Sequence, residues 1–124
     1  MGLFIMKPIL IKTIPHRKQR LHNSDIADYF ELSEKTVIAV SDLGDDRYNL
    51  LVMLHEMVEL FLITKAGIPI AEIDKWDCAH PKEMGDHPFA PYHKFHVMAT
   101  AIERFAAKQL GISWRDYEQT IERM

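Results

Sequence analysis

The feature that most limits the possible folds of this chain is an apolar run from Leu50 to Ile63, LLVMLHEMVELFLI. Eleven of its fourteen residues are hydrophobic, and on a helix they would occupy nearly every face rather than one stripe. Such a helix is stable in water only if other elements cover it on several sides. We therefore expect a central helix, covered by a sheet on one side and by helices on another.

The three polar residues of this run are His55, Glu56 and Glu59. Burying an unpaired carboxylate is costly, so buried carboxylates persist only where another group neutralises them, and a divalent metal ion does so. Residues four apart share one face of a helix, so His55 and Glu59 can bind one ion while Glu56 stands beside it. The pattern H-E-x-x-E differs at one position from the H-E-x-x-H of zinc peptidases.

The segment before this helix predicts a small sheet. Residues 8–14 (PILIKTI) have strand character, and residues 29–40 (YFELSEKTVIAV) form two strand-like runs around a polar turn at 33–35, which is typical of a hairpin. We expect these pieces to form a small antiparallel sheet. With 124 residues, the chain fits one α+β domain, 1–124, with a core large enough to need no disulfide.

Capping residues set the limits of the central helix. Asp45 or Asp46 can accept hydrogen bonds from its first free amides, and Gly67 stands where a left-handed residue ends a helix. The stretch from 70 to 90 has little periodicity, and we expect a long loop that controls access to a site.

A second helix is expected from Pro91 to Gly111, followed by a short C-terminal helix capped by Ser113 with Asp116 three residues on. Apolar residues at helical spacing predict the core stripe of the second helix: Phe95, Met98, Ala99, Ile102, Phe105, Ala106 and Leu110.

The second helix also carries a polar line formed by His93, His96 and Glu103. If the two long helices pack together, His96 completes a three-ligand metal site with His55 and Glu59, and the fourth position stays open to water. Glu56 would then take a proton from that water and pass it to a leaving amine. A ligating imidazole usually donates its other N–H to an oxygen, and the candidates for such supporting contacts are Glu103, Asp86, Asp77 and His93.

The segment LVMLHEMVELFL, followed by GDHPFAPYHKFHVMATAIER, resembles small proteins of bacteria and their phages with a minimal zincin-like core. The resemblance covers residues 36–110. It implies a zinc-dependent peptidase acting on a peptide or protein, with His55 as a ligand and Glu56 as the base. Zincins have histidine where this chain has Glu59, and a carboxylate there also suits manganese or iron.

Three other interpretations remain open. Glu56 with Glu59 and Asp74 with Asp77 form E-x-x-E and D-x-x-D, as in all-α, Mg-dependent nucleotide pyrophosphatases. The chain could instead be a structural or adaptor protein with a degenerate metal site. In the simplest interpretation there is no ion, and the polar residues of the apolar run lie at a helix edge or pair with Arg47 or Lys65.

Composition excludes several other classes. The formal net charge is −3, which gives no broad attraction to nucleic acid. No apolar stretch is long enough to cross a membrane. The chain has one cysteine, Cys78, so no internal disulfide can form, and we expect the reducing cytoplasm of a bacterium or an infected host cell.

Overall fold

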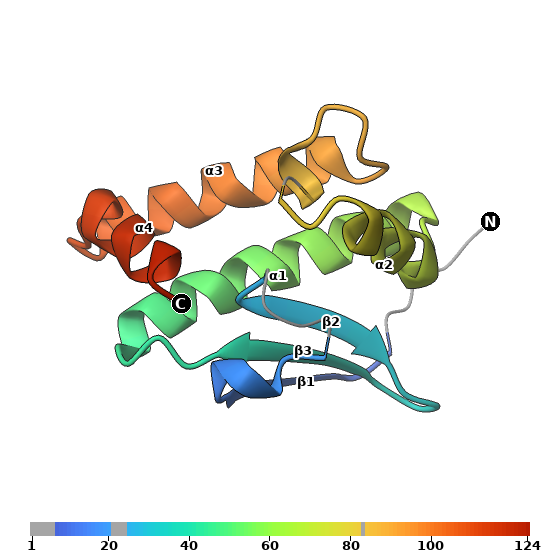
Figure 1. Ribbon diagram of the computed structural model, residues 1–124, viewed down its shortest axis with the longest axis horizontal. Coiled ribbons are helices and arrows are strands. Elements are labelled where there is room, and N and C mark those ends of the chain that lie inside the picture. Colours follow the sequence, from blue (N-terminus) through green and yellow to red (C-terminus); the bar gives the residue numbers. More distant parts are fainter. Residues whose placement is uncertain (1–6, 21–24, 83) are drawn as a thin grey trace.

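The computed structural model describes residues 7–20, 25–82 and 84–124, and these residues form an α+β fold. A three-stranded sheet lies on one side of the long helix α1, Asp46–Ala66, and helix α3, His93–Gln109, lies on the other (Figure 1). The expected covering of the apolar helix on two sides is confirmed. Leu51, Leu60 and Ile63 of α1 are fully buried as a result.

The sheet consists of β1 (Ile9–Ile14), β2 (Ala27–Glu31) and β3 (Thr36–Ser41), in the order β1-β3-β2. The hairpin is confirmed: β2 and β3 pair antiparallel, and the Leu32 amide donates to the Lys35 carbonyl across the turn. The expectation of a wholly antiparallel sheet is wrong, because β1 pairs parallel with β3. The hairpin turns β3 back between β2 and β1, so β1 and β3 run in the same direction.

The ends of α1 follow the capping signals. The Asp45 side chain accepts a hydrogen bond from the Arg47 amide, and Gly67 ends the helix with a φ of 77°. This left-handed conformation costs glycine little, and the Gly67 amide donates to the carbonyls of Ile63 and Thr64.

The region from 70 to 90 is not the plain loop that the sequence predicted. It contains helix α2, Ile70–Ala79, and a single 3₁₀ turn, η2, Met84–Asp86. Only Ile73 and Asp77 of α2 are buried. Because one of these two inward residues is an acid, the apolar periodicity that marks a helix is hidden in the sequence.

Helix α3 has nearly the expected limits but a different orientation about its axis. Its buried residues are Ala99, Glu103 and Ala107, whereas Met98 and Phe105 of the predicted core stripe are 47% and 65% exposed. Ile102 and Leu110 of that stripe are exposed too, and Phe95 and Ala106 are partly buried against the core. The predicted stripe is therefore wrong except at Ala99 and, in part, at Phe95 and Ala106. The helix turns its alanines and its polar line toward α1, since small side chains allow close packing.

Helix α4, Trp114–Glu122, closes the described chain, and the Ser113 hydroxyl accepts from the Asp116 amide as expected. Tyr117 of α4 is fully buried and belongs to the same core as Ile38 and Val40 of β3. Within the described ranges, no helix has the length and apolar character needed to span a membrane.

Candidate metal centre

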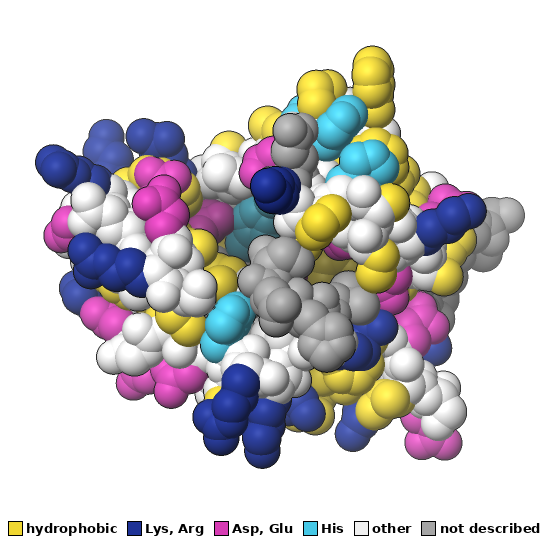
Figure 2. All heavy atoms as spheres, in the orientation of Figure 1, with side chains coloured by type: hydrophobic (Ala, Val, Ile, Leu, Met, Phe, Trp, Pro, Cys, Tyr) yellow, Lys and Arg dark blue, Asp and Glu magenta, His cyan; other side chains and the backbone are white. Residues whose placement is uncertain are grey.

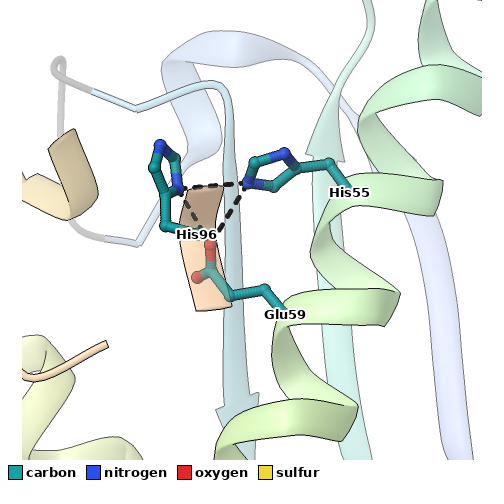
Figure 3. A group of neighbouring side chains, drawn as sticks. All are labelled: His55, Glu59 and His96. Carbon is teal, nitrogen blue, oxygen red and sulfur yellow. Dashed lines mark hydrogen bonds and ion pairs between the residues drawn. The ribbon is translucent and has the colours of Figure 1, made fainter. Parts of the chain in front are cut away.

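Three side chains from two helices converge on one point. His55 and Glu59 project from successive turns of α1, and His96 reaches them from α3 (Figure 3). His55 Nε2 lies 3.2 Å from Glu59 Oε2 and 3.2 Å from His96 Nδ1, and His96 Nδ1 lies 3.0 Å from the same Glu59 oxygen. The structure therefore brings together the three residues that the sequence predicted as ligands.

The size of this triangle suits a metal ion. Ligand atoms about 2.0–2.1 Å from a metal are about 3.0 Å apart in an octahedral arrangement and about 3.3 Å apart in a tetrahedral one. The three observed separations fall within that range, and the three ligand atoms leave the remaining positions around such an ion free.

Each histidine has its second ring nitrogen next to a carboxylate. His55 Nδ1 lies 2.8 Å from Glu103 Oε1, and His96 Nε2 lies 3.2 Å from Asp86 Oδ1. These carboxylates can accept the protons of His55 Nδ1 and His96 Nε2, so a metal that displaces the protons at His55 Nε2 and His96 Nδ1 would meet lone pairs that face the centre of the triangle. This carboxylate–histidine pairing is usual behind metal-binding imidazoles.

Two tyrosines complete the hydrogen bonding of the acids. Tyr29 of β2 donates its hydroxyl proton to Glu59 Oε1 at 2.8 Å, which leaves Oε2 for the triangle. Tyr117 of α4 donates to Glu103 Oε2. Neither tyrosine is recognisable as a site residue from the sequence, because only the folded hairpin and the packing of α4 bring them to the site.

The three ligands shift one another's pKa values. Burial alone would raise the pKa of Glu59, but hydrogen bonds from His55 and His96 lower it to about 2. Burial alone would lower the pKa of His55, but its hydrogen bonds to Glu103 and Glu59 raise it to about 11. The raised pKa of His55 favours its protonated form at neutral pH, so a metal cation would compete with a proton for the imidazole.

Glu56 behaves differently from its neighbour Glu59. Burial and the nearby charge of Glu59 raise its pKa well above the usual range. Its Oε2 lies 3.9 Å from His55 Nε2, and its side chain is only 10% exposed. Among the described residues it makes no hydrogen bond, and it lines a cavity beside the three ligands.

This cavity has a volume of about 380 Å³ and lies between β2 and the helices α1, α2, α3 and α4. Figure 2 shows the corresponding face hollowed, with histidine and acidic side chains visible inside. Its volume is in the range of small-molecule sites, and His55, Glu56, Glu59 and His96 all line it.

The remaining predicted contacts are placed elsewhere. Asp77 accepts a hydrogen bond from the Tyr92 hydroxyl rather than from a ligand imidazole. His93 Nδ1 lies 2.8 Å from the Gly85 carbonyl oxygen, so it does not contact the three ligands directly. Gly85 itself, which the sequence analysis missed, packs against the His96 ring: a Cβ at this position would lie 2.6 Å from His96 Cγ.

No protein-family model matches this chain, and neither the curated proteins nor the solved structures gave a match. The fold and the site define a class of protein: an α+β domain in which two histidines and one glutamate are arranged as candidate ligands of a single ion.

Proposed function

We propose that this protein binds one divalent transition metal through His55, Glu59 and His96 and hydrolyses a peptide bond with a metal-activated water. The observation that carries the proposal is the convergence of three ligand atoms, 3.0–3.2 Å apart, beside a cavity. In the described part of the chain, these three residues are the group of possible metal ligands that the structure brings together: one ligand atom from each lies within 4.8 Å of the other two.

A metal in this position would supply a bound water with a pKa near about 7 and would polarise the carbonyl under attack. Glu56 is the residue best placed to accept the water proton, because its carboxylate lines the same cavity and has no hydrogen-bond partner among the described residues. Its raised pKa also suits the return of that proton to a leaving amine. Tyr29, Glu103 and Asp86 hold the ligands in place.

Two imidazole nitrogens and one carboxylate oxygen favour zinc, with manganese or iron as the alternatives. The order of a strand, a helix with H-E and a later helix with the third ligand supports a zincin-like arrangement in which Glu59 replaces the usual histidine. The exposed free thiol of Cys78 fits the cytoplasm of a bacterium or an infected host cell.

Metal analysis of the purified protein tests the assignment. About one zinc, manganese or iron per chain is expected in the wild type, and almost none in His96→Ala. His93→Ala is the matched control, because it removes a half-buried histidine of the same helix that contacts Gly85 instead of the ligands. Equal metal content in wild type and His96→Ala would refute the site, and peptide cleavage that follows metal content would support the activity.

A magnesium-dependent nucleotide pyrophosphatase is the second candidate, and one observation favours it. Asp74 and Asp77 lie on a helix, α2, and line the same cavity as Glu56 and Glu59. The three-stranded sheet and the two imidazoles argue against it, since magnesium prefers oxygen ligands. Hydrolysis of nucleoside triphosphates with magnesium, but not with zinc, would favour this candidate. A protein with neither activity and no metal would fit the adaptor interpretation.

A further inference from the structure

The cavity beside the three ligands is far more acidic than the rest of the chain. Its described lining includes ten of the eighteen Asp and Glu residues of the protein, but only one of the fifteen Lys and Arg residues, Lys82. The net charge of the whole chain is only −3, so the negative charge is concentrated here. A cavity lined with one sign of charge attracts ligands of the opposite sign.

Part of this charge already has a partner. Arg20 forms ion pairs with Asp28 and Asp74. Glu103 and Asp86 contact the histidine ligands.

Glu118 and Glu122 of the lining are exposed. Of the acids that are not exposed, three have no cationic side chain in hydrogen-bond contact among the described residues: Asp25, Glu56 and Asp77. Asp25 accepts from the backbone amides of Ile26 and Ala27, and Asp77 accepts from the neutral hydroxyl of Tyr92. Glu56 accepts no hydrogen bond from the described part of the chain, although its side chain is nine-tenths buried and lines the cavity.

One divalent ion does not balance these acids. Its two positive charges would offset Glu59 and Glu56, and Asp25 and Asp77 would remain uncompensated. The negative charges of the cavity repel one another, and burial and this repulsion together raise the pKa values of both residues. Burial, then the charges of Asp77 and Glu59, raises the pKa of Asp25 to about 7, and burial together with Glu59 raises the pKa of Asp77 to about 6.

A second metal ion fits this part of the cavity poorly. Neither Asp25 nor Asp77 belongs to a group of three ligand atoms within 4.8 Å among the described residues. A protonated amine needs no such convergence, because it donates separate hydrogen bonds of about 2.8 Å to carboxylates that are further apart. The cavity volume of about 380 Å³ also leaves room for an organic group.

We propose that the substrate carries a positively charged amine or guanidinium group, which Asp25 and Asp77 bind beside the metal-activated water. This inference rests on the proposed function, whose substrate class it specifies. The charge comes either from the free amino terminus of a peptide or from a lysine or arginine side chain next to the cleaved bond.

Four hydroxamates test the proposal on the zinc-loaded protein, because a hydroxamate binds the metal and presents its side chain to the cavity. L-Lysine hydroxamate has both amines, L-norleucine hydroxamate only the α-amine, and N-acetyl-L-lysine hydroxamate only the side-chain amine. N-Acetyl-L-norleucine hydroxamate has none. Calorimetry should show at least one cationic probe binding about tenfold more tightly than the neutral one, the factor expected for a charge-assisted hydrogen bond.

The doubly substituted variant Asp25→Asn, Asp77→Asn should reduce this preference to less than about threefold while zinc content stays at one ion per chain. Both changes keep the side-chain shape, and asparagine can still accept from Tyr92. Glu118→Gln is the matched control, since Glu118 is an exposed acid of the same cavity lining. Equal binding of neutral and cationic probes, or a preference that survives in the double variant, would overturn the proposal.

The corresponding amides, titrated into metal-free protein and followed by NMR, separate this proposal from the proposed function. A preference for cationic amides in a protein that binds no zinc would refute the metal site and keep the cationic subsite. Zinc binding and peptide cleavage without any preference for cationic probes would support the metal site and refute the cationic subsite. A second zinc ion that is lost in the double variant would assign the acids to a metal and overturn the amine proposal.

Discussion

Replacing Glu56 by glutamine should remove activity and, at the same time, stabilise the metal-free protein. The pKa of Glu56 is raised by burial and by the charge of Glu59, so at neutral pH the folded state must keep a carboxyl group protonated or bury its charge. Glutamine has the same shape and no charge. Hydrolysis should fall about 10²- to 10⁴-fold, the usual contribution of a general base, with metal content unchanged.

The sign of the stability change depends on pH. Below the unfolded pKa of 4.5, the carboxyl is protonated in both states, and glutamine brings almost no gain. Above that pH the unfolded chain ionises before the folded one, and each pH unit up to the raised pKa costs the wild type about 1.4 kcal/mol. We expect a gain of about 1–3 kcal/mol at pH 7, which corresponds to a Tm higher by about 3–10 °C for a chain of this size.

Thermal unfolding of metal-free wild type and Glu56→Gln at pH 4.5 and pH 8 measures this effect. Glu59→Gln is the control from the same helix, because the pKa of Glu59 is lowered to about 2. Its charge stabilises the fold above about pH 4.5 and is lost as the pH falls toward 2, so Glu59→Gln should destabilise by about 2–4 kcal/mol at pH 7. A Glu56→Gln protein that is less stable than wild type at pH 8, or a gain that does not shrink at pH 4.5, would refute the reasoning.

Three further results are expected. Because the pKa of His55 is raised to about 11 without metal, zinc must displace a proton at pH 7. Zinc affinity should therefore rise about tenfold per pH unit, and the calorimetric heat of zinc binding should depend on the buffer. A heat of binding that is independent of the buffer would contradict this. Gly85→Ala should weaken zinc binding about 10- to 100-fold, since its Cβ would lie 2.8 Å from His96 Nδ1; unchanged affinity in a competition titration would show that the ring tolerates the shift. Tyr29→Phe removes the hydrogen bond to Glu59 Oε1 and should cost about 1–3 kcal/mol in urea unfolding, together with part of the zinc affinity; a variant as stable as wild type would disprove that role.

Local signals predicted the part of this fold that local physics determines. The apolar run and the caps at Asp45 and Gly67 act within a few residues, so α1 has the predicted limits. The hairpin depends on a short turn and is correct for the same reason. The parallel pairing of β1 with β3 joins segments far apart in the sequence, and no local pattern encodes it.

The candidate site divides in the same way. His55 and Glu59 were found because a four-residue spacing fixes their common face, and His96 because a second helix was expected to pack on the first. Gly85 and Tyr29 were missed, since their roles depend on contacts that exist only after η2 and β2 have folded against the ligands. Neither residue type marks a site without that context.

The orientation of α3 is the point where folding energetics and the proposed function conflict. Turning Met98 and Phe105 inward would bury apolar surface, and each such side chain is worth about 1.5–3 kcal/mol when fully buried. The helix instead leaves both substantially exposed and buries Glu103, whose oxygens contact His55 and Tyr117. Hydrophobic burial alone does not select this orientation. It is the orientation that delivers His96 to His55 and Glu59, and natural proteins depart from the general folding preferences chiefly at functional sites.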